Sequence, residues 1–286
     1  MGERDQSTHP KPTPLDKTDD TAAERAAFPS ALSNAGPATL ALPGAASMVA
    51  RSMGVPIRLL PVLGRVVRPI SEFFAPARPL VDRLVPLLVP GQTVLDLGCG
   101  KGGVSHQLAA RARVSVVGVD AHAPFIDAAR KIAASYAFAH RCRFYIDDVT
   151  APGTWMRPAD LVLALGLGTV YGTPEATVRF LATLVAPGGA LAWGNLVQRS
   201  QVEALSDTVA AALDAAGFVL CHSQTGWAAD EAAALRDRAD RLASESRVLA
   251  QRSPMFAGDL EGFVHQWRDG VAVPDATPLI VVAQHR

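Results

Sequence analysis

Apolar and polar positions change rhythm repeatedly from about residue 92 to the end of the chain. Short, nearly continuous apolar runs, typical of buried strands, alternate with segments whose apolar residues recur every three or four positions, as in helices. The runs predict strands at 92–99, 114–120, 142–149, 159–168, 189–197, 218–225 and 277–285. The helical patterns lie at 103–112, 124–139, 173–186 and 200–217. This alternation predicts an α/β protein with a mostly parallel sheet covered by helices on both faces.

Residue types mark several boundaries in this pattern. Thr173 followed by Pro174 is typical of a helix start. Gly217 is placed as a glycine cap that ends a helix. The tripeptide Pro187-Gly188-Gly189 predicts a break between the helix at 173–186 and the following strand.

Three segments do not follow the alternation. Residues 1–46 are rich in Pro, Thr, Ser, Ala and Gly, and we expect them to form a disordered tail. Residues 47–90 are apolar but broken by prolines, which predicts short helices packed before the first strand, or alternatively a lid over a pocket. Residues 230–270 predict a helical insert before the last strand, beside the carboxyl ends where ligands bind in such sheets. We therefore expect a single domain over 47–286.

Composition and charge narrow the partners. Lys plus Arg equals Asp plus Glu at 27 each, and no basic patch with interleaved aromatic residues occurs, so no nucleic-acid partner is predicted. No stretch has the form of a membrane span or a signal peptide. Three scattered cysteines, Cys99, Cys142 and Cys221, predict neither disulfides nor a metal site and favour a cytoplasmic protein. The sequence predicts no particular oligomeric state.

A glycine-rich stretch, VLDLGCGKGG at 94–103, carries the strongest chemical signal. Gly98, Gly100 and Gly103 match G-x-G-x-x-G directly after a predicted strand and before a predicted helix. Glycines there allow a tight turn and the close approach of a ligand, and the helix N-terminus favours an anionic group. Asp120 ends the second strand, where a carboxylate can accept hydrogen bonds from both ribose hydroxyls of an adenosine.

Dinucleotides and S-adenosylmethionine both fit this geometry, and three details favour the second. Asp96 stands two residues before Gly98, where a carboxylate can reach the ammonium of a methionine part, whereas dinucleotide sites usually keep this position apolar. Asp148 stands at the end of the third strand, where an acid can accept from an adenine amino group. The stretch LVAPGGALAW places Pro-Gly-Gly before the fifth strand.

At these motifs the chain resembles the class I S-adenosylmethionine-dependent methyltransferases. VLDLGCGKGGVSHQLA, VVGVDAHAPFIDAAR, DDV and LVAPGGAL stand in the family's order, and the resemblance covers about residues 85–225 and the final strand. It implies a Rossmann-like seven-stranded sheet whose last strand lies antiparallel between strands five and six. LGLGTVYG and the charged helix at 230–252 also resemble a bacterial subgroup of small-molecule methyltransferases whose substrates are poorly defined.

The resemblance also assigns cofactor contacts. The backbone near Gly98 would approach the methionine part, Asp120 would hold the ribose, and the third strand's end would meet the adenine. The end of the fourth strand would lie near the amino group. The implied cofactor-binding residues are Asp96, Gly98, Cys99, Gly100, Asp120, Ala121, Asp148, Val149, Leu165 and Gly166.

The methyl group of S-adenosylmethionine leaves a sulfonium by in-line displacement, which alignment in a dry site can accelerate. No catalytic residue is then obligatory for a thiolate, phenolate or amine acceptor, whereas a hydroxyl acceptor benefits from a base. His265 and Tyr171 are the candidates for such a catalytic group near the acceptor. We expect structural or remote positions for His106 and His222, and a turn role for Asn195.

Two alternatives stay open beside a methyltransferase that acts on a small molecule. An NAD-dependent oxidoreductase could use the same glycine loop, although Asp96 and Asp148 oppose it and no Tyr-x-x-x-Lys pair occurs. A non-catalytic protein that binds S-adenosylmethionine would keep the same cofactor residues. The absence of a [DN]PP[YF] sequence after the fourth strand argues against methylation of a nucleobase amine.

Overall fold

The computed structural model describes residues 56–59, 62, 77–151, 153–168, 170–272 and 276–286, which all belong to one structural unit. Within them, the strands form a single sheet in the order β3-β2-β1-β4-β5-β7-β6. The strands are β1 (Thr93–Leu97), β2 (Ser115–Asp120), β3 (Cys142–Ile146), β4 (Ala159–Leu165), β5 (Val185–Gln198), β6 (Phe218–Thr225) and β7 (Ala276–His285). β7 is antiparallel to β5 and β6, and the other pairs are parallel, which confirms the expected fold.

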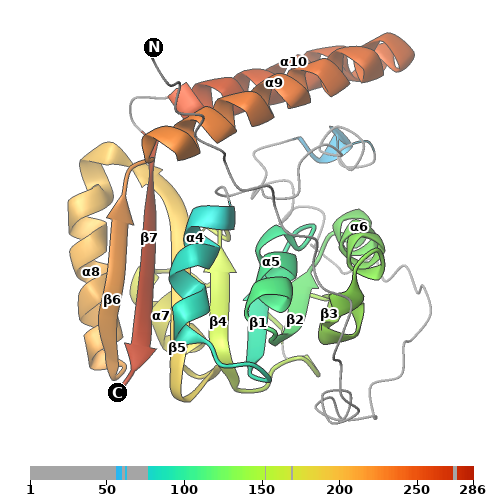
Figure 1. Ribbon diagram of the computed structural model, residues 1–286. Coiled ribbons are helices and arrows are strands. Elements are labelled where there is room, and N and C mark those ends of the chain that lie inside the picture. The colour runs from blue at the N-terminus through green and yellow to red at the C-terminus, as the bar shows by residue number, and fades with distance from the viewer. Residues whose placement is uncertain (1–55, 60–61, 63–76, 152, 169, 273–275) are drawn as a thin grey trace, which may run out of the picture. The chain divides into compact units, whose positions relative to one another are not determined.

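Two apolar cores cover the faces of the sheet, and alternate residues of each strand feed them. Along β1, Val94 enters one core, whereas Leu95 and Leu97 enter the other. The helices α4 (Ala77–Leu84) and α5 (Gly103–Arg111) complete the first core, and α7 (Pro174–Ala182) and α8 (Val202–Ala215) complete the second. Figure 1 shows these two pairs on opposite faces of the sheet. The continuous apolar runs of the central strands reflect burial on both faces.

A smaller apolar cluster lies beside β2 and β3, under α6 (Ala123–Ala134). Phe144 and Cys99 pack there, and Gly118 of β2 leaves room for both. A Cβ added at Gly118 would lie 2.5 Å from the Phe144 ring and 2.9 Å from the Cys99 sulfur. The absence of a side chain at residue 118 therefore lets β3 pack beside the glycine-rich loop.

The helix boundaries agree with the residue types that predicted them, but the fifth strand does not. The Thr173 side chain accepts a hydrogen bond from the Ala176 N–H at the start of α7, and Gly217 adopts a φ of 85° after α8. The prediction of a break at Pro187-Gly188-Gly189 was wrong, because β5 runs from Val185 to Gln198 through these residues. A register shift against β4 accommodates them between Ala159 and Leu161.

The predicted insert between the last two strands forms two long helices, α9 (Ala229–Arg252) and α10 (Ala257–Ala272), which pack against each other. A buried stripe at seven-residue spacing runs along α9 at Leu235, Ala239, Leu242, Ser246 and Leu249. Glu231 is buried at the start of α9, where its carboxylate accepts the N–H of Ala228 and the side-chain amide of Gln224. These bonds fasten α9 to β6, at the edge of the sheet where the parallel strands end.

Only part of the segment expected to pack before the first strand falls within the described residues. α4 packs on the sheet, and the short 3₁₀ turn η1 (Ile57–Leu59) contacts α10, because the Arg58 guanidinium donates to both carboxylate oxygens of Asp259 at 2.7 and 2.6 Å. The remaining short 3₁₀ turns are η2 (Val85–Leu87), η3 (Ala137–Arg141), η4 (Arg199–Gln201) and η5 (Pro254–Phe256). The predicted tail at 1–46 lies outside the described residues. Among the helices described, none has the length and apolar character needed to cross a membrane.

Candidate cofactor site

The glycine-rich loop lies at the carboxyl end of β1, between β1 and α5. Gly98, Gly100 and Gly102 have φ values of 68°, 55° and 76°, a conformation that side chains with a Cβ rarely adopt. The N–H groups of Gly98 and Cys99 both donate to the carbonyl of Val119, at 2.8 and 3.1 Å. The loop is thus fixed to β2, and its bare backbone lies at the edge where ligands bind in parallel sheets.

Asp120, at the end of β2, joins that loop to α6. One carboxylate oxygen accepts the N–H of Gly100 at 2.9 Å, and the other accepts the N–H of His122 at 2.8 Å. Burial raises the pKa of Asp120 to about 6, against the two hydrogen bonds, which lower it. Each carboxylate oxygen has a further lone pair, so the group can still accept from two hydroxyls.

Asp96 lies one strand away from Asp120, on β1, and is only 4% exposed. Its carboxylate accepts a hydrogen bond from the Ser105 hydroxyl of α5 at 2.6 Å. Burial raises the pKa of Asp96 to about 7, the Ser105 bond lowers it, and the nearby Asp120 adds a small upward shift. Such a carboxylate would be ionised more readily beside a cation, which fits the expected ammonium of a methionine part.

A second group of side chains follows β3, where the adenine is expected. The Asp147 carboxylate accepts the indole N–H of Trp155 at 2.8 Å. The Asp148 carboxylate accepts the N–H and the hydroxyl of Thr150 through the same oxygen, Oδ1, at 2.8 and 2.7 Å. This arrangement orients Asp148 while its other oxygen, Oδ2, remains an available acceptor.

Tyr171 reaches the same group from the loop between β4 and α7. Its hydroxyl donates to the carbonyl of Val149 at 3.1 Å, and its ring stacks on Phe180 with 4.6 Å between the ring centroids. Burial raises the pKa of the Tyr171 hydroxyl, and Asp148 raises it further. Asp148 and Val149, where the adenine is expected, form what we call the adenine corner. Because the Tyr171 hydroxyl is bonded to the backbone of Val149, Tyr171 is better suited to holding this corner than to acting as a base.

The loop after β4 also touches the glycine-rich loop. Gly166 extends the sheet, since its N–H donates to the Gly194 carbonyl at 2.8 Å. The next residue, Leu167, lies directly on Gly98: a Cβ added to Gly98 would come within 2.3 Å of its Cδ2 atom. The sequence pointed to Leu165 and Gly166 at this place, but Leu167 is the residue whose side chain makes the contact.

Asn195 holds this loop in place, which the sequence did not predict. Its amide oxygen accepts the N–H of Gly168 at 2.8 Å, and its amide nitrogen donates to the Gly168 carbonyl at 3.3 Å. The expectation of a turn role was wrong, because Asn195 lies inside β5 and pairs with Leu279 of β7. No local pattern signals such a bond between a strand and a loop 27 residues earlier.

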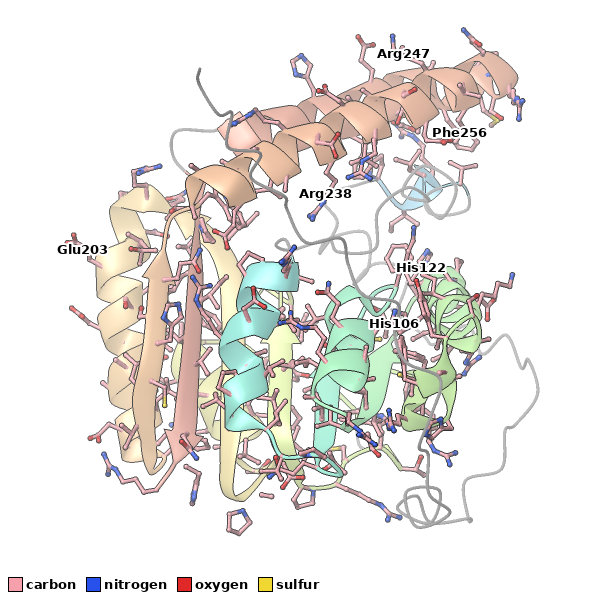
Figure 2. All side chains as sticks on the ribbon, in the orientation of Figure 1. His106, His122, Glu203, Arg238, Arg247 and Phe256 are labelled. Carbon is pink, nitrogen blue, oxygen red and sulfur yellow. The ribbon has the colours of Figure 1, made fainter. Side chains whose placement is uncertain are left out.

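The histidines take different positions, two of which Figure 2 labels. His106 of α5 is buried, with Nε2 3.1 Å from the Ala129 carbonyl and its ring edge-on to Phe144, which confirms a structural position. His122 stands at the start of α6 beside Asp120, and its buried Nε2 has no hydrogen-bond partner among the described residues. Burial lowers the pKa of each imidazole to about 4, so both rings are neutral near pH 7.

The two other histidines considered from the sequence, His222 and His265, lie on elements that do not adjoin the glycine-rich loop in the sequence. His222 is on β6, where burial lowers the pKa of its imidazole and the charge of Arg83 lowers it further, while a hydrogen bond with Gln224 raises it. His265 lies on α10 with an exposed side chain. Neither is brought into contact with Gly98 or Asp120 by any described hydrogen bond.

Taken together, the elements define a class of protein: a doubly wound α/β fold whose glycine-rich loop, after β1, is bonded to an acidic side chain at the end of β2. A comparison with protein families adds to this. Residues 94–189 match the family model described as a methyltransferase domain. The matched stretch contains the glycine-rich loop together with Asp96, Asp120 and Asp148.

Solved structures share the fold at low sequence identity. YjhP from E. coli is 17% identical, with a TM-score of 0.63, over 80% of this chain and 100% of its own. A methyltransferase from Geobacter sulfurreducens in complex with S-adenosylhomocysteine is 18% identical, with a TM-score of 0.62, over 77% of this chain and 96% of its own. The [4+2]-cyclase SpnF is equally similar, at 18% identity and a TM-score of 0.62, over 84% of this chain and 96% of its own. These likenesses establish the fold, and the fold serves more than one reaction.

Proposed function

We propose that the protein transfers the methyl group of S-adenosylmethionine to a small-molecule acceptor with an oxygen, nitrogen or sulfur nucleophile. One observation carries the proposal beyond the family match. Asp120 holds the N–H of Gly100 while its carboxylate keeps the lone pairs that two ribose hydroxyls need. The same residue thus shapes the glycine-rich loop and offers the adenosine contact.

The residues of the site fit the cofactor part by part. Asp120 would hold the ribose, with Ala121 beside the adenine, and the unpartnered Nε2 of His122 is a further polar atom on this side. The free oxygen of Asp148 would accept from the adenine amino group, and the Val149 N–H would meet a ring nitrogen. The bare backbone at Gly98, Cys99 and Gly100 would admit the methionine part, whose ammonium Asp96 would face.

When bound, S-adenosylmethionine would supply a methyl group on a positively charged sulfur. An aligned nucleophile would bond to the methyl carbon as the carbon–sulfur bond breaks, and S-adenosylhomocysteine would leave. The protein's own contribution is to hold the donor rigidly and to exclude water, which supports displacement without a protein base. Tyr171 is bonded to Val149, and His265 is exposed, so neither supplies a base in this arrangement. This favours acceptors that are already nucleophilic, such as a thiolate, a phenolate or an amine.

The choice of a small acceptor rests on the neutral balance of charges and on the absence of a basic patch in the sequence. We also place the protein in the cytoplasm, because its three cysteines are free thiols: Cys99 is buried, Cys142 is half-buried and Cys221 is exposed. A non-catalytic protein that binds the same cofactor would share every cofactor contact, so only methyl transfer itself distinguishes the two.

Calorimetric titration of the purified protein with S-adenosylhomocysteine and, separately, with NADH tests the cofactor. Micromolar binding of S-adenosylhomocysteine alone is expected, and binding of NADH alone would overturn the proposal. Incubation with methyl-labelled S-adenosylmethionine and a cell extract then tests the acceptor. Label in the small-molecule filtrate supports the proposal, whereas label retained on protein or nucleic acid, or on neither, contradicts it. The Asp120→Ala variant is the matched control for both steps.

A further inference from the structure

The loop between β4 and α7 meets the glycine-rich loop through one side chain. Leu167 occupies the space where a Cβ of Gly98 would stand, with its Cδ2 and Cγ atoms 2.3 and 3.1 Å from that position. Gly98 is the glycine that the methionine part of the cofactor is expected to approach. Leu167 therefore lies at the methionine end of the site, away from the adenine corner at Asp148.

Asn195 determines where that side chain lies. Its amide oxygen accepts the N–H of Gly168 at 2.8 Å and its amide nitrogen donates to the Gly168 carbonyl at 3.3 Å, which fixes the residue directly after Leu167. Gly168 has a φ of 61°, so the chain turns sharply at the point that Asn195 holds. On the other side of Leu167, Gly166 is bonded to Gly194, the neighbour of Asn195 in β5. The residues on both sides of Leu167 are therefore hydrogen-bonded to β5.

The support behind Asn195 is rigid. Asn195 is 7% exposed and stands in the long pairing of β5 with β7, opposite Leu279, which is fully buried. A buried side-chain amide that lost its partners would leave polar groups unsatisfied, so the pair of bonds is strongly favoured. A wall residue that is held from a central strand can keep a donor within the small tolerance that displacement requires.

We propose that Asn195 is a positioning residue: through Gly168 it holds Leu167 as the wall of the cofactor site at the methionine end, against Gly98. This inference rests on the proposed function, because it takes S-adenosylmethionine as the ligand. The inference gives β5 a role in the site through Asn195. Leu167 makes the contact with Gly98, and Asn195 determines where Leu167 lies.

Two probes separate this role from general destabilisation. S-adenosylhomocysteine contains the amino-acid part, whereas adenosine contains only the ribose and the adenine. In the full-length protein, Asn195→Ala should weaken binding of S-adenosylhomocysteine roughly 3- to 10-fold, the range expected for one or two lost hydrogen bonds. Adenosine affinity should change less than about 2-fold, because Asp120 and Asp148 are left intact. Asn195→Asp, which keeps the size of the side chain but cannot donate to the Gly168 carbonyl, should show the same selectivity.

A double-mutant cycle tests whether Asn195 acts through Leu167. Leu167→Ala should reproduce the selective loss, and the double variant Asn195→Ala/Leu167→Ala should bind S-adenosylhomocysteine no more weakly than the worse single variant. Gln284→Ala is the matched control, since Gln284 also bonds a glycine carbonyl, at Gly188, but at the opposite end of the sheet. It should leave both affinities unchanged.

The outcomes distinguish the inference from the function on which it rests. If the unmodified protein binds neither probe, the proposed function and the inference both fail. If it binds S-adenosylhomocysteine but Asn195→Ala and Asn195→Asp weaken both probes equally, or neither, the function stands and the positioning role is overturned. Additive losses in the double variant would also overturn it, because the two residues would then act independently.

Discussion

The carboxylate of Asp120 accepts the backbone N–H of Gly100 at 2.9 Å, which joins the end of β2 to the glycine-rich loop after β1. Under the proposed function, this one side chain would both shape the loop and hold the ribose. The loop's conformation depends on this bond, because Gly100 has a positive φ and belongs to no helix or strand. Changes at Asp120 should affect the empty site as well as the bound one.

Replacement of Asp120 should weaken cofactor binding more than it weakens the fold. Asp120→Ala removes the acceptor for two backbone N–H groups and for the ribose, and should cost about 1–3 kcal/mol in S-adenosylhomocysteine affinity. Asp120→Asn keeps one acceptor oxygen and should cost less. Titration calorimetry on both variants ranks their affinities for S-adenosylhomocysteine. If the Asp120→Ala protein binds as tightly as the unmodified protein, the ribose is held elsewhere.

Cofactor affinity should fall as the medium becomes more acidic. Burial raises the pKa of Asp96 to about 7 and that of Asp120 to about 6, so both carboxyls take up protons as the pH drops through this range. The bound ligand offers an ammonium and two hydroxyl donors, which favour the ionised carboxylates, so binding releases protons. We expect S-adenosylhomocysteine to bind roughly tenfold more weakly at pH 5 than at pH 8.

Two variants check the origin of this pH dependence. Asp120→Asn should flatten the part of the affinity profile near pH 6, since the amide does not titrate in this range. Gln284→Ala, which changes a side chain at the opposite end of the sheet, should leave the profile unchanged. A profile that is equally steep in the Asp120→Asn protein would assign the proton to another group.

Tyr171→Phe should reduce the preference of the site for adenine. The variant loses the hydrogen bond to the Val149 carbonyl but keeps the stack on Phe180. Because the neighbouring N–H of Val149 is expected to meet the adenine ring, its position should become less defined, and affinity for adenosine should fall by about 1 kcal/mol. Competition between adenosine and inosine measures the preference. Tyr136→Phe is the control, since Tyr136 also stacks on a phenylalanine, Phe138, but is exposed and lies between α6 and η3.

Gly118→Ala should destabilise the protein, because its new methyl group would overlap the Phe144 ring and approach the Cys99 sulfur. Overpacking of this kind typically costs about 1–3 kcal/mol in the free energy of unfolding. Gly262→Ala is the matched control: Gly262 lies in α10 with nothing within 4 Å of an added Cβ. It should leave stability equal or raise it by up to about 1 kcal/mol. Thermal and urea unfolding of the two variants provide the comparison, and equal stability of both would show that β3 shifts freely.

The sequence predicted the parts of the fold that local patterns encode. Burial on both faces gives β1 and β4 their continuous apolar runs, and the glycine-rich loop is recognisable because its residues are adjacent in the chain. The same logic failed at β5, since Pro187-Gly188-Gly189 is typical of a turn and only the pairing with β4 and β7 shows that the strand continues through it.

The sequence predicted the residues expected to bind the cofactor better than the residues that hold the neighbouring loops in place. Asp120 and Gly100 are brought together as the motif implied, because consecutive parallel strands end at the same edge. The bonds of Asn195 to Gly168 and of Tyr171 to Val149 join residues from different strands and loops, and no spacing rule connects them. The buried stripe of α9 specifies its packing against α10 and carries no information on an acceptor.

The position of β7 has a consequence for how the chain reaches this structure. β7 fills the gap between β5 and β6, so Trp193 finds its partner Val281 only after α8, β6, α9 and α10 have been passed. Pairings of such sequence separation close large loops and slow folding. Until β7 enters, β5 has an open edge and β6 has no neighbouring strand at all, and open edges invite association with other chains. During synthesis, we expect the nascent protein to depend on chaperones most in the interval between the emergence of β5 and the arrival of β7.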